Sequence, residues 1–140
     1  MTARSLQNTV PLPDKICGDS IRLKQVLVNL IKNALKFSFA KPILVLAHYS
    51  YEKQILEVHI QDAGQGIHEK SRKRLFKLFG RLNDTDAAGP RDLNEVRVGM
   101  GLSICKKIVE RANGKIDFFS RGLRQGSTFI FTMKMPLPYD

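Results

Sequence analysis

The 140-residue sequence lacks the features that mark secreted, membrane-spanning and repetitive proteins. Cys17 and Cys105 are its only cysteines, which is too few for a disulfide framework, and we expect both to be reduced inside a cell. No apolar run approaches the roughly 20 residues that cross a bilayer, and residues 1–10 lack the apolar segment of a signal peptide. There is no internal repeat and no low-complexity tract. These absences predict a cytoplasmic location for the chain, and a longer parent protein can still be membrane-anchored.

Acidic residues are also scarce, because 13 Asp and Glu stand against 23 Lys and Arg and leave a formal charge of +10. Such an excess can indicate nucleic acid, anionic lipid or an acidic protein as a partner. The basic residues are scattered through every segment, without a basic tail or an aromatic-interleaved repeat, so we expect no nucleic acid partner. A basic surface that favours polyphosphate ligands is the better interpretation.

The residues that are present fit one globular domain over 1–140, with 43% hydrophobic and 26% charged residues. Asp19 is a suitable N-cap for a helix over 21–37, a stretch without Gly or Pro. Alternating apolar residues predict a strand over 55–61, which forms a hairpin with a buried strand over 43–49. Four further elements are expected, in this order: a helix over 69–79, a polar lid over 83–98, a helix over 101–113 with Gly114 as its C-cap, and a closing hairpin of 115–120 and 127–135.

Three short strings carry the chemistry: NLIKNALKF at 29–37, DAGQG at 62–66 and GMGLS at 99–103. In the first string, Asn29, Asn33 and Lys36 lie on one polar stripe of the predicted helix. Mg²⁺ prefers oxygen ligands and keeps several waters, so the amide oxygen of Asn33 is a candidate metal ligand. Lys36 can reach a phosphate as a point charge. The alternative for this stripe is an ordinary solvated helix face.

In the second string, Asp62 directly follows the predicted strand and can accept a hydrogen bond from the amino group of a base. Gly64 and Gly66 permit positive φ angles or a close backbone approach. In the third string, Gly99 and Gly101 lead into a predicted helix N-terminus, where free N–H groups and the helix dipole favour phosphate. The alternatives are a common turn and a flexible hinge. Together the three strings predict a Mg·ATP site.

The order and wording of these strings resemble the catalytic and ATP-binding domain of sensor histidine kinases. That family belongs to a wider ATPase superfamily with gyrase, the Hsp90 chaperones and the MutL repair proteins. The resemblance extends from PLPDKICGD near the start to GSTFIFTMKMPLP near the end, and DSIRLKQVLVNLIKNALKFS is its most specific part. It implies an α/β (α+β) fold, in which a two-layer sandwich places helices over a mixed β-sheet.

The resemblance also implies roles for individual residues. Asn33 would hold Mg²⁺, Asp62 would contact the adenine amino group, and Arg81 would be directed at the terminal phosphate. Packing is the alternative role for Phe79, in LFKLFGR at 75–81. The nucleotide contacts that the resemblance implies at the remaining motif positions are these: Asn29, Lys36, Gly64, Gly66, Ile67, Phe79, Gly99, Met100, Gly101, Leu102 and Thr128.

The chain departs from its superfamily at two positions. Asn29 stands where the ATP hydrolases carry a glutamate that activates water, and an amide has no useful basicity. Arg97 stands where the histidine kinases usually have a third glycine, which places the closure of the lid in doubt. Asn29 favours transfer of phosphate to another nucleophile over hydrolysis.

The three histidines, His48, His59 and His68, lie outside any phosphoacceptor motif. We therefore interpret the chain as the catalytic domain of a two-component, and possibly hybrid, histidine kinase, trimmed at its N-terminus and monomeric by itself. It would transfer the γ-phosphoryl group of Mg·ATP to a histidine on a separate dimerisation domain, with a receiver domain downstream. The alternatives are a nucleotide-binding module without phosphotransfer and a fragment of an ATP-hydrolysing chaperone or topoisomerase.

Overall fold

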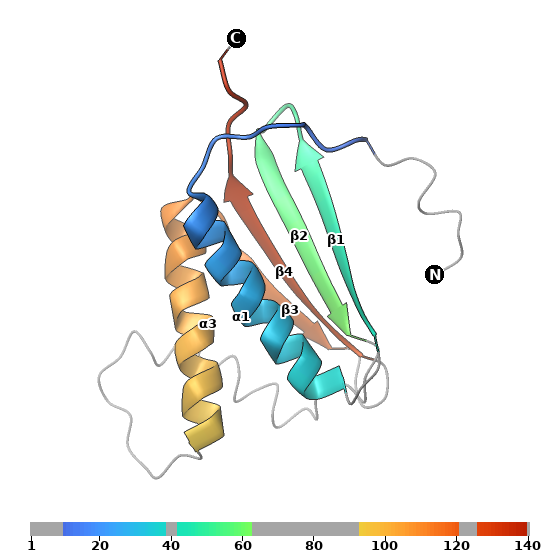
Figure 1. The fold of residues 1–140 in the computed structure, drawn as a ribbon, viewed down its shortest axis with the longest axis vertical. Coiled ribbons are helices and arrows are strands. Elements are labelled where there is room, and N and C mark those ends of the chain that lie inside the picture. Colours follow the sequence, from blue (N-terminus) through green and yellow to red (C-terminus); the bar gives the residue numbers. More distant parts are fainter. Residues whose placement is uncertain (1–9, 39–41, 63–92, 121–125, 140) are drawn as a thin grey trace.

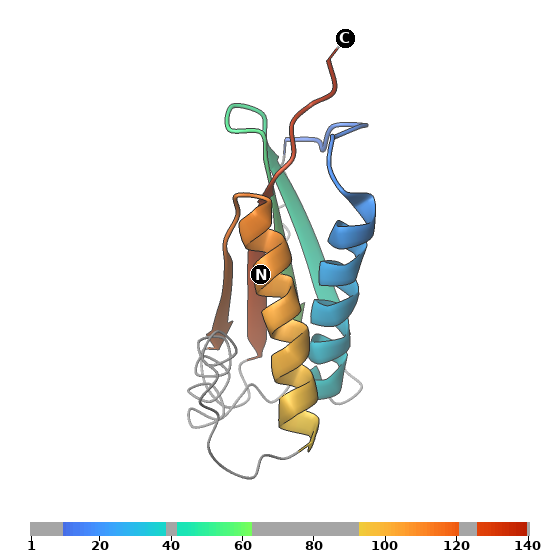
Figure 2. The same cartoon turned by 90° about the vertical axis from the view of Figure 1, so that its left-hand side faces the viewer.

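A computed structural model describes residues 10–38, 42–62, 93–120 and 126–139. Helices α1 and α3 lie side by side and cover one face of a four-stranded sheet (Figures 1 and 2). This confirms the predicted two-layer α/β arrangement. The elements, in chain order, are α1 (Ser20–Ser38), β1 (Ile43–Ser50), β2 (Ile55–Asp62), α3 (Leu93–Arg111), β3 (Ile116–Ser120) and β4 (Ser127–Lys134).

The sheet has the strand order β1-β2-β4-β3, and each of its three described pairings is antiparallel. The expectation of a mixed sheet is therefore not met in the described part of the chain. Both predicted hairpins are confirmed: β1 pairs with β2, and β3 pairs with β4. The pairing of β2 with β4 is the long-range one, and it sets Asp62 opposite Ser127.

Helix α1 begins where the sequence predicts. One carboxylate oxygen of Asp19, Oδ1, accepts hydrogen bonds from the backbone N–H groups of Ile21 and Arg22, both at 3.1 Å. This contact satisfies two N–H groups that have no partner inside the helix, and it makes Asp19 the N-cap. The face of α1 that enters the core carries Val26, Leu30 and Ala34, spaced four residues apart.

The core lies between the helices and the sheet. Strands β2 and β4 each alternate between buried and half-buried residues, so one face of each strand meets the helices. The rings of Phe118 and Phe129 pack with their centroids 4.7 Å apart, and the Tyr49 hydroxyl donates to the Met135 carbonyl oxygen at 2.7 Å. None of the helices among the described residues combines the length and the hydrophobicity that a membrane crossing requires.

Helix α3 differs from the prediction at both ends. It begins at Leu93 rather than at residue 101. At its other end Asn113, with φ of 54°, adopts the left-handed conformation, and the Gly114 N–H donates to the Val109 carbonyl at 2.9 Å. This is a Schellman cap in which Asn113, not the expected Gly114, supplies the positive φ. Gly114 is required for another reason: a Cβ there would lie 1.7 Å from the Thr132 carbonyl oxygen.

Candidate functional site

The candidate site is built around a carboxylate at the end of a strand. Asp62 is the last residue of β2, and only 6% of its surface is exposed. The hydroxyl of Ser127, the first residue of β4 and its register partner, donates a hydrogen bond to Asp62 Oδ2. Burial and this bond fix the direction of the carboxylate. An ionised carboxylate has about four acceptor positions, so a ligand amino group can share it with Ser127.

The residue on β4 that contacts Asp62 is Ser127, whereas Thr128 was predicted as a nucleotide contact. Successive side chains of a strand point to opposite faces, and Thr128 pairs with Gln61 on the other face of the sheet. The predicted nucleotide contact of Thr128 is thus placed away from the Asp62 carboxylate. Ser127 was not predicted as a site residue. Its signal was the alternation of β4, in which Ser127, Phe129 and Phe131 follow at two-residue intervals and share the core face.

Asn33 has the most unusual environment of the α1 residues. Only 9% of its surface is exposed, and its side-chain Nδ2 is buried without a hydrogen-bond partner in the described part of the chain. A buried N–H group without a partner costs about 1–3 kcal/mol. Folding alone therefore gives no reason to place an amide here, whereas a ligand with acceptor oxygens would satisfy it.

Asn29 lies one turn before Asn33, is half-buried and faces α3. The Cβ of an alanine at position 101 would lie 3.9 Å from both Cγ and Oδ1 of Asn29. Burial raises the pKa of the neighbouring Cys105 thiol to about 11, and a hydrogen bond with the Asn29 side chain opposes that shift. Asn29 thus lies at the contact between the two helices, whereas Lys36, one turn beyond Asn33, is exposed.

The glycine pair of the third string lies inside α3. Gly99 and Gly101 were predicted to lead into a helix that begins at residue 101 and to offer free N–H groups to phosphate, but α3 starts at Leu93. In this conformation they do not form a helix N-terminus. Leu102, predicted to contact the nucleotide, is fully buried in the hydrophobic core. Met100 also lies within the helix, and its side chain is outside the description.

Several predicted residues fall outside the described part of the chain. They are Gly64, Gly66, Ile67, His68, Phe79 and Arg81, together with the predicted helix over 69–79 and residues 83–92 of the predicted lid. Arg97 lies in the α3 backbone, but its side chain is not described. His48 and His59 lie in strands, as predicted, and the His59 ring nitrogen Nε2 is 2.6 Å from Glu57 Oε1.

The described parts of the site gather at one end of the molecule. The C-terminal end of α1, the end of β2, the beginning of β4 and the beginning of α3 all lie at the lower end in Figure 1. The fold therefore brings the Asn33 region, the Asp62–Ser127 pair and the glycine-bearing part of α3 to the same end. Each of the three strings thus contributes at least one described residue to this end (Figure 1).

Comparison with known proteins identifies the same family that the three strings resemble. Residues 18–137 match the family described as histidine kinase-, DNA gyrase B-, and HSP90-like ATPase. The chain is 38% identical over 129 residues to the signal transduction histidine-protein kinase BarA of Escherichia coli K12, covering 90% of this chain and 13% of BarA. It thus spans about an eighth of that relative.

Two solved structures resemble the fold. Full-length ShkA in complex with AMPPNP superposes with a TM-score of 0.67 at 26% identity, over 93% of this chain and 25% of that one. The catalytic domain of histidine kinase ThkA superposes with a TM-score of 0.59 at 28% identity, over 86% of this chain and 71% of that one. Both similarities extend along most of the chain.

Proposed function

Because the chain belongs to the histidine kinase-, DNA gyrase B-, and HSP90-like ATPase family, we propose that it binds Mg·ATP as the catalytic domain of a two-component histidine kinase. It transfers the γ-phosphoryl group to a histidine on a separate dimerisation domain, and a receiver domain accepts the phosphate downstream. The observation that carries this proposal is the buried, hydrogen-bonded carboxylate of Asp62 at the end of β2. We expect the domain to be monomeric and to work in the cytoplasm.

Asp62 is the base-recognising residue in this proposal. Its carboxylate accepts a hydrogen bond from the exocyclic amino group of adenine. Guanine, uracil and thymine have a carbonyl oxygen at the corresponding position and cannot donate this bond. A hydrogen bond to a charged acceptor is stronger than a neutral one, and the desolvated position of Asp62 strengthens it further. Ser127 positions the carboxylate through the hydrogen bond that it donates to Oδ2.

Asn33 is the residue that fits a metal ion. Mg²⁺ binds oxygen ligands, keeps several waters and is usually completed by substrate phosphates, so one amide oxygen from the protein is sufficient. When bound, Mg²⁺ would neutralise charge on the phosphates. The buried Nδ2 of the same side chain, which has no partner among the described residues, would donate to a phosphate oxygen. Lys36 and Arg81 would add positive charge near the phosphates.

The nucleophile in this proposal is a histidine of the partner domain, not water. Asn29 has an amide where water activation needs a basic side chain, and it is held against α3. A neutral imidazole carries its own lone pair, so the domain mainly has to position the phosphates and stabilise their charge. This favours the kinase over the ATP-hydrolysing fragment.

The start of α3 changes conformation when the triphosphate binds. A glycine inside a helix costs about 0.5–1 kcal/mol relative to alanine, and α3 contains Gly99 and Gly101. Among the described residues, a Cβ at position 101 would meet only ordinary contacts at 3.9 Å, so their packing does not require a glycine there. We infer that a second conformation requires it, in which N–H groups near Gly99 and Gly101 turn to the phosphates and residues 83–98 close as a lid.

Phosphotransfer in trans tests the proposal. The chain is incubated with γ-labelled ATP alone and with the His-bearing dimerisation domain of its parent kinase. We expect acid-labile label on the added domain, no label on the chain, and slow release of phosphate without the partner. A variant of the partner with its acceptor histidine replaced by Gln is the control. Rapid phosphate release by the isolated chain, or label that remains on the chain, would show that it is a hydrolase or labels itself.

A further inference from the structure

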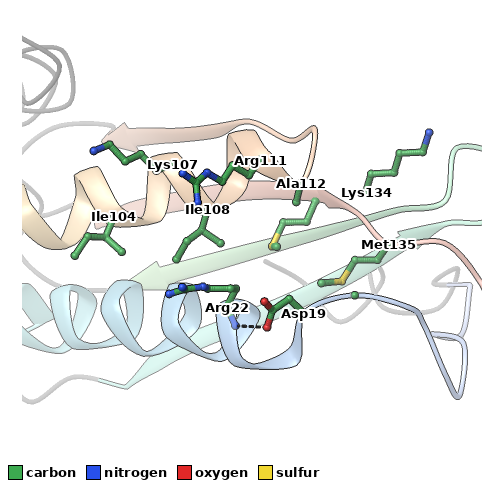
Figure 3. A pocket seen from close by; sticks show the side chains of 11 residues that line it. Asp19, Arg22, Ile104, Lys107, Ile108, Arg111, Ala112, Lys134 and Met135 are labelled. Atoms are coloured by element: carbon green, nitrogen blue, oxygen red, sulfur yellow. Dashed lines mark hydrogen bonds between the residues drawn. The ribbon is translucent and has the colours of Figure 1, made fainter.

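A cleft lies at the end of the molecule opposite Asp62 (Figure 1). It encloses about 470 Å³ between the first turn of α1 and the last turns of α3, next to the end of β4 (Figure 3). Its floor is apolar and its rim is basic. The floor residues that matter here are Ile104, Ile108, Met133 and Met135, and the rim residues are Arg22, Lys107, Arg111 and Lys134. This "basic cleft" shares no residue with the proposed nucleotide site.

Among its described lining residues, the basic cleft has four cations and one carboxylate, and it therefore keeps a net positive charge. Within the described residues, none of the four rim cations forms an ion pair. Asp19 is the one carboxylate among the described lining residues, and its Oδ1 accepts the N-cap hydrogen bonds of α1. Lys107 and Arg111 are four residues apart on α3, a spacing at which like charges repel. An anionic partner would remove this repulsion.

The cleft is built as two parallel rows on α3. Ile104 and Ile108 form an apolar row, and Lys107 and Arg111 form a basic row beside it, each with a spacing of about 6 Å along the helix axis. Ile104 is 39% exposed, which is high for an isoleucine beside a hydrophobic core. An amphipathic helix presents apolar and acidic side chains in rows of the same spacing.

We propose that the basic cleft docks an acidic amphipathic helix of a partner protein, with apolar side chains on the isoleucine row and carboxylates on the basic row. The ligand is extended rather than a single small anion, because Lys107 and Lys134 lie towards opposite ends of the cleft and do not converge on one point (Figure 3). Charge complementarity sets the specificity. The net charge of +10 accelerates the encounter with an acidic partner.

A designed peptide tests this proposal on the full chain. The probe is a fluorescein-labelled 16-residue helix with Leu at every fourth position and Glu three residues after each Leu, and binding is followed by fluorescence anisotropy. We expect saturable binding that weakens with salt, and no binding of the same peptide with Lys in place of Glu. The double variant Lys107→Glu/Arg111→Glu should lose about tenfold in affinity or more, and Ile104→Ser should lose less.

The matched control is Lys24→Glu/Lys32→Glu, which makes the same change of charge at exposed positions of α1 outside the cleft. It should bind the peptide nearly as well as the unchanged chain, and both double variants should bind ADP normally, which shows that they are folded. Equal loss in both double variants, or no saturable binding, overturns the proposal. If the peptide does not bind, inorganic tripolyphosphate is titrated into the Asp62→Ala variant and followed by NMR at Arg22 and Lys107. Saturable binding of tripolyphosphate at the cleft would then show a small-anion site and would also overturn the proposal.

Discussion

The base-binding and phosphate-binding parts of the proposed site differ in how firmly the fold holds them. Asp62 ends a strand that is paired on both sides, and its carboxylate is buried and bonded to Ser127. Gly99 and Gly101 lie in a helix that does not need glycine at position 101. In the proposed function, the strand end keeps one geometry, whereas the glycine-bearing part of α3 adopts two. In the proposed site, a preformed base-binding carboxylate therefore adjoins a phosphate-binding segment that forms only with its ligand.

We expect the largest effect on nucleotide affinity at Asp62, the part of the site that the fold holds firmly. Asp62→Ala removes the acceptor for the adenine amino group and should weaken ADP binding by about 1.5–3 kcal/mol, the range for hydrogen bonds to charged groups. Titration calorimetry measures this. Thr128→Ala, one residue from Ser127 on the other sheet face, is the matched control and should bind ADP almost normally. Equal affinities of the Asp62 variant and the unchanged chain would remove the base-binding role.

Asn33→Ala should have the next largest effect, and only on the phosphate side. The Mg²⁺-dependent part of ATP binding should fall by about tenfold, or about 1.4 kcal/mol, while Mg²⁺-free binding changes little. The unfolding free energy should not fall with it, since the substitution also removes a buried N–H group that has no partner among the described residues. A loss of stability that matches the loss of binding would show that Asn33 instead supports the fold.

Gly101→Ala tests the proposed second conformation of α3. In the unliganded protein it should raise the unfolding free energy by about 0.5–1 kcal/mol, because the Cβ fits and alanine favours a helix. It should weaken the binding of Mg·AMPPNP while leaving adenosine binding nearly unchanged. Thermal unfolding and calorimetry measure the two quantities. A variant that gains stability and binds AMPPNP normally would mean that the helix does not rearrange.

The smallest effect concerns Cys105, which lies at the contact of α3 with α1. Burial raises the pKa of its thiol to about 11, so the rate of alkylation in a Cys17→Ser background should keep rising with pH up to that value. Because this folded-state pKa exceeds the ordinary 9.0, the unfolding free energy should decrease as the pH rises from 9.0 towards 11. A rate that levels off near pH 9, or that increases strongly with AMPPNP, would place Cys105 in the rearranging part of α3.

The elements that the sequence predicted correctly are those with local signals. The N-cap Asp19, the apolar spacing of α1 and the alternation of β2 each act within a few residues, so their positions follow from the chain itself. The start of α3 was wrong because residues 93–100 show no clear apolar period and contain a glycine. A helix extends more readily than it nucleates, so the packed segment around Leu102 and Cys105 can propagate backwards into such a sequence.

The candidate site likewise combines features that a local sequence pattern predicts with features that depend on the tertiary fold. Asp62 was predictable because a carboxylate after an alternating strand is visible in the sequence. The Asp62–Ser127 hydrogen bond joins residues 65 positions apart, and it depends on the register of β2 with β4, which no local pattern sets. The burial of Asn33 likewise depends on how α1 packs, so the sequence indicated its type of chemistry but not its orphaned N–H group.

The most direct test of this account is an NMR titration of the isotope-labelled chain with Mg·AMPPNP, read at the Cα resonances of Gly101 and Asp62. Before the nucleotide is added, Gly101 should show a helical shift and Asp62 a strand shift. At saturation, Asp62 should keep its strand shift while its amide resonance moves, and Gly101 should lose its helical shift. No saturable change at either residue, or a Gly101 shift that stays helical at full occupancy, would contradict the account.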